Sequence, residues 1–451
     1  MVEPGGAHRA RRPVGADAEE AAGMSARDAV SAHNLAARLG DAGDAAGAVA
    51  ACARAFAAGG DAPETHLVHA RALQTLGRWD DAERAFAAAI ARRPDYAVAH
   101  RDWAQLRWMR SGDAAAALRA LDAAPDTIEL ALVRGAVLNG VGQPERAAAV
   151  LDRAAARAPG TLDVRLAAAG MAGQLGRAQR QLDHATAALT AAPASIAAAR
   201  AATEALLHLG RVGEAAALAE RVVAAAPDDQ AAIALLATAW RLTGDPRHAA
   251  LCGDPALVTA RRIATPPGWA DLPAFLADLA AALEGLHGWR AHPLEQSIRH
   301  GSQTQVDLSR SDVPVIRALF AALDAPIRAH IAGLGSGDDA VRRRVTGGYR
   351  FAGAWSVRLR PGGFHTDHVH PAGWLSSAFY VALPDAVARA PQGWLALGRP
   401  GVPTRPALAP LRHIRPEAGM VALFPSYLWH GTEPFDGEAT RLTVAFDVVP
   451  A

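Results

Sequence analysis

The chain has 451 residues, more than one hydrophobic core usually supports, so two or three domains are expected. Hydrophobic residues make up 51% and charged residues 20%, a balance that is typical of folded proteins and excludes a largely disordered chain. The 46 basic and 45 acidic residues leave a formal net charge of +1, which gives no indication of nucleic acid or an anionic membrane as a partner. No uninterrupted apolar run of about 18 residues occurs, so we expect no membrane span.

Residues 1–27 are expected to form a disordered tail. Arg9, Arg11 and Arg12 are not followed by an apolar stretch, so no secretory signal is expected, and Met24 is a second possible start. The two cysteines lie far apart in the sequence, which favours reduced thiols and a cytoplasmic location.

A repeat of 34 residues runs through the N-terminal half. Glycines keep this interval at Gly142, Gly176, Gly210 and Gly244, and prolines keep it at Pro159, Pro193 and Pro227. Glycine suits a turn that needs a positive φ, and proline ends a helix because it disfavours helix in the residue before it. An earlier copy begins at Gly77, and one repeat, which ends near Pro125, is shorter by three residues. The pattern predicts helical hairpins over residues 28–251.

Small residues follow these glycines and are expected to let the second helix of each hairpin pack against the first. They are Ala82, Ala147, Ala215 and Ala249, whereas Gln181 breaks the pattern. Together with Trp79, the period resembles that of tetratricopeptide repeats. The resemblance implies a solenoid whose concave groove binds a protein or peptide. An unrelated alanine-rich bundle is the alternative.

The C-terminal part, residues 252–451, has a different character. Helices are expected over residues 269–286 and from an N-cap at Ser311 to about residue 331. Five short segments read as strands, at residues 355–359, 375–383, 394–397, 420–424 and 441–449. Short strands separated by glycine and proline turns predict an antiparallel sandwich or jelly roll.

A cluster of histidines carries the chemistry. His365, Asp367, His368 and His370 lie within six residues, and His430 follows much later, after an apolar segment. Ligands at positions i and i+2 of a strand face the same way, and a third ligand from a distant strand completes a facial triad that suits Fe(II).

One basic side chain and one hydroxyl side chain follow on the last expected strand. Arg441 can hold a carboxylate through a two-pronged contact, and Thr443, two residues on, can donate its hydroxyl from the same face. These residues predict an anion site next to the histidines.

The same segments resemble the 2-oxoglutarate–Fe(II) oxygenase family over residues 355–449. The resemblance is carried by HVHPAGWLSSAFYVALP from His368, MVALFPSYLWHGTEPF from Met420 and RLTVAF from Arg441. The segment HPLEQSIRHGSQT, from His292, resembles the lead-in of bacterial members fused to tetratricopeptide repeats. The resemblance implies a double-stranded β-helix, Fe(II), 2-oxoglutarate and O₂. It also implies hydroxylase-type oxidation, and the repeats suggest a protein or peptide as the recruited substrate.

The ligand pair is open at this point. We favour His368 and His370, together with His430, which leaves Asp367 to orient an imidazole. The alternative pair is His365 with Asp367, which has opposite parity on a regular strand.

Tyr380 is either a further contact of the co-substrate or a core residue. Two other functions compete with an oxygenase. One is a repeat-based binding protein whose β-domain is inactive, and the other is a cupin-like metalloenzyme that does not use 2-oxoglutarate and for which Arg441 would be dispensable.

Overall fold

The computed structural model describes residues 14–451, with side chains described from Ser25 onward. Of the expected tail, residues 1–13 lie outside the described residues, whereas residues 14–27 belong to helix α1 (Val14–Asp41). The chain divides into two compact units, the first comprising Met1–Leu106 with Ala120–Pro125 and the second Arg107–Arg119 with Asp126–Ala451.

The first unit consists of helical hairpins. Its helices are α1, α2 (Ala45–Ala57), α3 (Pro63–Thr75), α4 (Trp79–Arg92) and the first part of α5 (Ala97–Ser111). Gly43 and Gly77, with φ of 86° and 72°, occupy the turns within the hairpins, and the sequence predicted the turn at Gly77. Phe86 is fully buried between the helices.

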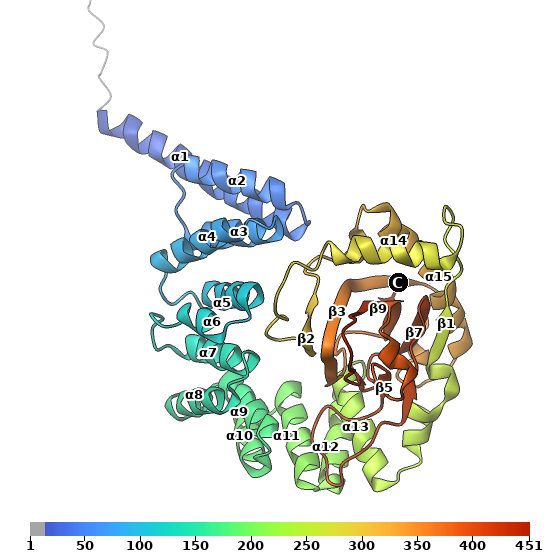
Figure 1. The fold of residues 1–451 in the computed structure, drawn as a ribbon. Coiled ribbons are helices and arrows are strands. Elements are labelled where there is room, and N and C mark those ends of the chain that lie inside the picture. The colour runs from blue at the N-terminus through green and yellow to red at the C-terminus, as the bar shows by residue number, and fades with distance from the viewer. Residues whose placement is uncertain (1–13) are drawn as a thin grey trace, which may run out of the picture. The chain divides into compact units, whose positions relative to one another are not determined.

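The second unit begins with more of the same hairpins (Figure 1). Its helices are α6 (Ala114–Arg119), α7 (Ile128–Gly140), α8 (Pro144–Arg157), α9 (Leu162–Gln174), α10 (Ala178–Ala191), α11 (Ile196–Leu209), α12 (Val212–Ala225) and α13 (Gln230–Thr243). The shorter repeat corresponds to α6, which has only six residues. One packing prediction is wrong: Ala249 is exposed in a π-helical turn, Ala249–Gly253, because the chain leaves the repeat after α13.

The rest of the second unit is an antiparallel sheet that is nearly closed into a roll, with helices α14 and α15 along one side (Figure 1). Within the described residues, the order is β1-β7-β4-β9-β3-β8-β5-β6, and β2 pairs with β3. The elements are β1 (Thr259–Arg262), α14 (Leu272–Glu284), β2 (Ile298–Gln303), α15 (Pro314–Leu334), β3 (Tyr349–His368), β4 (Leu375–Ala382), β5 (Leu395–Leu397), β6 (Arg412–Ile414), β7 (Met420–Pro425), β8 (His430–Thr432) and β9 (Arg441–Pro450). The prediction of an all-α repeat followed by a mainly β roll is confirmed.

Some boundaries differ from the sequence predictions. Strand β3 has 20 residues rather than the five expected, because its first half pairs with β9 and its second half with β2 and β8. Helix α15 takes Val313 as its N-cap, and the hydroxyl of Ser311 accepts a hydrogen bond from the Val313 N–H instead.

The last repeat helix, α13, belongs to the core of the roll. Ile233 and Ala237 lie in the same buried cluster as Trp374. Outside this cluster, the indole Nε1 of Trp429 donates to the hydroxyl of Thr238 over 3.0 Å. The helical repeats and the strands therefore share one hydrophobic core at this end.

A segment that we call the rim segment, residues 289–297, joins α14 to β2 and is fastened to other helices of the same unit. The N–H groups of Arg290 and Ala291 donate to the carbonyl of Met109 over 2.8 and 3.1 Å. The indole of Trp108 donates to the carbonyl of His292 over 2.8 Å. At the end of α7, Gly140 leaves room for Leu294 of the rim segment. The Cδ2 of Leu294 lies 2.7 Å from the position that a Cβ at residue 140 would occupy.

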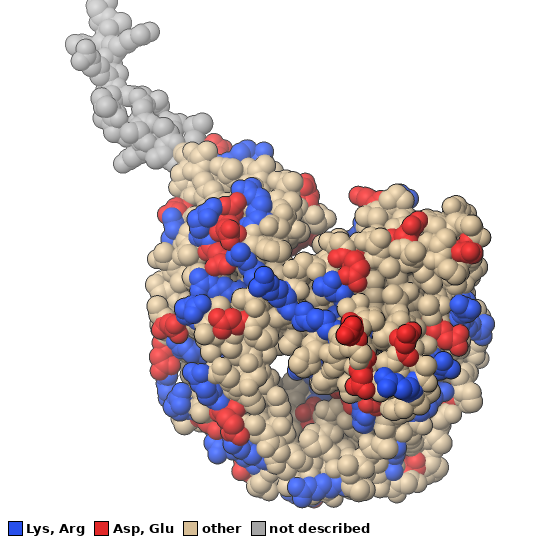
Figure 2. Space-filling view, viewed as in Figure 1, with Lys and Arg blue, Asp and Glu red and all other residues tan. Residues whose placement is uncertain are grey.

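Charged side chains of both signs are intermixed on the face shown in Figure 2, which agrees with a net charge near zero. Within residues 14–451, no helix is both long and apolar enough to cross a membrane.

Replacement of Ile233 tests the shared core. Ile233→Ala should lower the free energy of unfolding by about 2–5 kcal/mol, because it removes buried methyl groups and leaves a cavity. The measurement is urea unfolding followed by circular dichroism. Leu286→Ala, at a side chain that is 37% exposed, is the control and should change the stability by less than about 0.5 kcal/mol. Equal, small effects of both changes would contradict a shared core.

Candidate functional site

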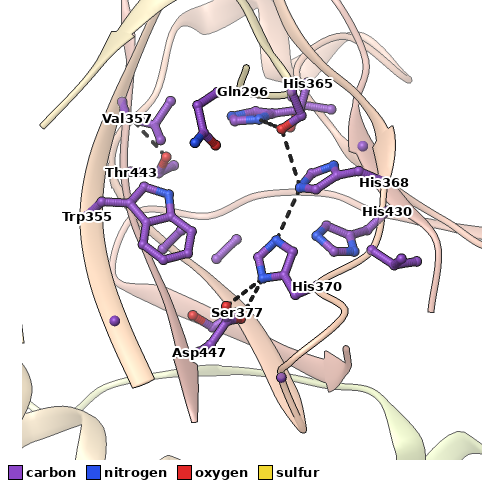
Figure 3. A pocket seen from close by; sticks show the side chains of 18 of the residues that line it. Gln296, Trp355, Val357, His365, His368, His370, Ser377, His430, Thr443 and Asp447 are labelled. Carbon is purple, nitrogen blue, oxygen red and sulfur yellow. Dashed lines mark hydrogen bonds and ion pairs between the residues drawn. The ribbon is translucent and has the colours of Figure 1, made fainter. Parts of the chain in front are cut away.

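A cavity of about 560 Å³ lies inside the roll. Figure 3 shows His365, His368, His370 and His430 along one wall, with Trp355 and other side chains of β3 and β9 across from them. The rim segment contributes Glu295, Gln296 and Ser297 to the same lining. The cavity thus combines residues that are up to about 150 positions apart in the sequence.

Three of these histidines converge. One ring nitrogen of each of His368, His370 and His430 lies within 4.8 Å of the others, a spacing that could hold a metal ion. The ring centroids of His368 and His430 are 4.2 Å apart. His430 faces His368 directly in the pairing of β8 with β3.

Hydrogen bonds fix the tautomer of each ring. Nδ1 of His368 donates to the carbonyl of Thr366 over 2.8 Å, and Nδ1 of His430 donates to that of Leu428 over 2.9 Å. Nδ1 of His370 faces an acceptor too, the carboxylate of Asp447. Because Nδ1 carries the proton in each ring, Nε2 keeps a free lone pair.

The free nitrogens face one another. Nε2 of His370 lies 3.2 Å from Nε2 of His368, and two lone pairs at this distance repel unless a cation lies between them. Burial lowers the pKa of His368 to about 4 and the pKa of His430 well below its usual value, which keeps both rings neutral. Neutral imidazoles are the form that binds metals, so this donor set fits a divalent ion such as Fe(II).

The backbone around the histidines is less regular than the sequence suggested. A bulge in β3 between His365 and His368 breaks the alternation of side chains. His365 therefore also lines the cavity, where its Nδ1 is 3.0 Å from the hydroxyl of Ser297. His370 lies beyond the end of β3, and its N–H donates to the carbonyl of Ser426 over 3.1 Å.

Asp367 is not brought to the three histidines. Its carboxylate accepts a hydrogen bond from Nε of Arg399 over 2.5 Å, and Arg399 also pairs with Glu433. Asp367 does not line the cavity. The expectation that Asp367 orients an imidazole is wrong, since Asp447 makes that contact.

The expected anion site lies in the same cavity. Arg441 is only 2% exposed, and its Nε donates to the carbonyl of Gly393 over 3.2 Å. In the described part of the chain, no carboxylate lies within ion-pair distance of this guanidinium. The guanidinium carbon lies 5.2 Å from the centre of the Tyr380 ring, and the buried Tyr380 hydroxyl has no hydrogen-bond partner among the described residues. Thr443 lines the cavity beside them.

Two residues of the site were missed from the sequence. Asp447 shares the alternating face of β9 with Arg441 and Thr443, so the strand pattern already contained the signal. Ser297 carried no such signal, because it reaches the histidines only through the path of the rim segment.

Comparison with known families agrees with this geometry. Residues 353–447 match the family model described as "Putative 2OG-Fe(II) oxygenase". This matched region contains the four clustered histidines, Arg441 and Asp447, and leaves the helical repeats outside. A search of curated proteins finds no match.

Each of the solved structures resembles about half of the chain. PilW, described as a type IV pilus biogenesis factor, is 19% identical over 46% of this chain and 98% of its own, with a TM-score of 0.37. A tetratricopeptide repeat protein from Parabacteroides merdae is 15% identical over 50% and 90%, with a TM-score of 0.37. A Pseudomonas putida prolyl-4-hydroxylase is 18% identical over 45% and 98%, with a TM-score of 0.30. All three TM-scores are below 0.5, and the fold assignment rests on the helix hairpins and strand pairings themselves.

Removal of single ligands tests the metal centre. His430→Ala should lose most of the Fe(II) bound after anaerobic loading, because two remaining imidazoles hold the ion poorly. His370→Ala should lose more metal than Asp367→Ala, whose carboxylate is paired with Arg399. His66→Ala, in the first unit, is a histidine control and should bind as the wild type does. The ligand set is wrong if Asp367→Ala abolishes binding while His370→Ala keeps it.

Proposed function

We propose that this protein is an Fe(II)- and 2-oxoglutarate-dependent oxygenase, with His368, His370 and His430 as the metal ligands. The observation that carries the proposal is the buried guanidinium of Arg441, which has no carboxylate partner among the described residues and lies in the same cavity as three convergent imidazoles. Fe(II), 2-oxoglutarate and O₂ would together supply the oxidising power to hydroxylate a C–H bond.

Arg441 binds the anionic end of the co-substrate in this proposal. A buried charge without a partner is costly, so a carboxylate that reaches the guanidinium is strongly favoured. The hydroxyl of Tyr380, which lacks a partner among the described residues, can donate to the same carboxylate. The hydroxyl of Thr443 donates to the Val357 carbonyl over 3.4 Å, a long hydrogen bond that it can exchange for one to the carboxylate.

The other residues of the cavity hold the ligands in place. The carbonyls of Thr366 and Leu428 keep the lone pairs of His368 and His430 directed at the metal position. The apolar side chains of Val357, Leu395 and Phe424 line the interior, and they limit the access of water.

For the substrate, we propose only a chemical class. Tetratricopeptide-type repeats usually present a groove to proteins or peptides, so we infer that the repeats recruit a protein or peptide whose side chain is oxidised. Both cysteines, Cys52 and Cys252, are buried free thiols, which supports a reducing, cytoplasmic setting.

Titration of 2-oxoglutarate into iron-loaded protein without oxygen tests the role of Arg441. Arg441→Ala should keep the metal but weaken 2-oxoglutarate binding by about ten- to a hundredfold, since a hydrogen bond to a charged group contributes about 1.5–3 kcal/mol. Arg441→Lys should recover part of the affinity, because an ammonium group cannot make the planar, two-pronged contact. Thr443→Val should show a smaller loss.

Two outcomes would contradict the proposal. Normal affinity in Arg441→Ala would remove the reason for placing the co-substrate at this arginine. An iron-loaded wild type that binds no 2-oxoglutarate would favour a cupin-like metalloenzyme or a repeat-based binding protein instead.

A further inference from the structure

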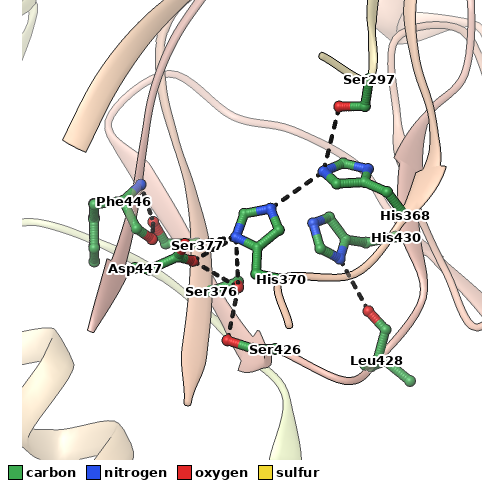
Figure 4. A network of polar contacts seen from close by, with 10 residues as sticks. All are labelled: Ser297, His368, His370, Ser376, Ser377, Ser426, Leu428, His430, Phe446 and Asp447. Atoms are coloured by element: carbon green, nitrogen blue, oxygen red, sulfur yellow. Dashed lines mark hydrogen bonds and ion pairs between the residues drawn. The ribbon is translucent and has the colours of Figure 1, made fainter. Parts of the chain in front are cut away.

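Asp447, which lies behind His370, belongs to a partly buried polar network (Figure 4). Both carboxylate oxygens of Asp447 lie within 2.7 Å of Nδ1 of His370. The hydroxyl of Ser376 donates to Asp447 over 2.7 Å and lies 2.9 Å from the hydroxyl of Ser426. Ser376 faces Asp447 in the pairing of β4 with β9, so the sheet itself sets this geometry.

Asp447 has a single charged partner in the part of the chain that the structure describes. Among the described residues, His370 is its only ion-pair partner, and no arginine lies within 4.0 Å of it. Asp367 offers the opposite case, since it lies two and three residues from His365 and His370 in the sequence but is paired with Arg399 outside the cavity. Of these two carboxylates near the histidines, only Asp447 directs its charge at a ring of the triad.

Such a contact changes the ring as a metal ligand. A carboxylate on the Nδ1–H fixes the orientation of the imidazole and makes its other nitrogen more basic. Three neutral imidazoles around a divalent ion leave two positive charges in a buried cavity, whereas the commoner two-histidine, one-carboxylate set leaves one. A negative charge one ring away removes this difference.

We propose that Asp447 is a positioning residue that supplies the carboxylate charge of the metal centre through His370. The inference rests on the proposed function, because it assumes that the triad binds a divalent metal. It assigns to Asp447 an effect on metal affinity, while the contact with 2-oxoglutarate belongs to Arg441.

Anaerobic titration of the full chain with Fe(II), and with Co(II) followed by its visible spectrum, tests this role. Asp447→Ala should weaken the metal affinity by about ten- to a hundredfold, the usual effect of losing such a partner. Asp447→Asn keeps an oxygen that can accept from Nδ1 but removes the charge, so it should lie between Asp447→Ala and the wild type. The Co(II) spectrum should report the same three nitrogen ligands in Asp447→Asn.

The matched control is Asp367→Asn, which removes a charge that is paired with Arg399 outside the cavity and should leave the metal affinity near that of the wild type. Thermal unfolding of each metal-free variant separates a structural role from a role at the metal, because only the latter changes metal affinity at unchanged stability. If Asp447→Ala does not fold, Asp447→Asn decides. If neither folds, Ser376→Ala decides, since it removes the hydroxyl that anchors the carboxylate and should cause a smaller loss in the same direction.

The outcomes distinguish this inference from the proposed function. A wild type that binds metal, with folded Asp447 variants of equal affinity, overturns the inference and leaves the oxygenase standing. A wild type that binds no divalent metal overturns both.

Discussion

The antiparallel pairing of β3 with β9 is the constraint on which the site depends. The pairing runs from Tyr349 opposite Pro450 to Leu359 opposite Arg441. Because side chains alternate along a strand, Arg441, Thr443 and Asp447 all lie on the face of β9 that lines the cavity. A shift of the register by one residue would turn all three to the other face. The guanidinium, the hydroxyl and the carboxylate are therefore placed together by one set of backbone hydrogen bonds.

The cavity combines two opposite electrostatic demands. Convergent lone pairs on neutral rings favour a cation, and a buried guanidinium that meets no carboxylate of residues 14–451 favours an anion. In a medium of low dielectric, each demand is stronger than it would be in water. A metal ion together with an anionic ligand would satisfy both demands at once.

Much of this arrangement follows from the sequence. The features that could not be predicted from it have identifiable physical causes. The 34-residue period gave the hairpins because glycine turns such as Gly142 require a positive φ, and the alternation of β9 gave the face of Arg441. The bulge before His368 could not be predicted from the sequence, because it depends on the pairing of β3 with two other strands. The burial of Gln181, which breaks the repeat pattern, could not be predicted either. It depends on the space that Gly173 leaves and on a hydrogen bond with His208.

The rim segment has a consequence for the history of the chain. Its backbone bonds to the carbonyl of Met109, it packs against Gly140, and it carries Ser297 to the histidines. The helices before residue 251 thus support a segment that lines a cavity whose chemistry lies after it. Recombination that joined the strands to a foreign set of repeats would strip this segment of its support. An exchange of the repeats alone is therefore expected to disturb the site, even though no described residue of the helices lines the cavity.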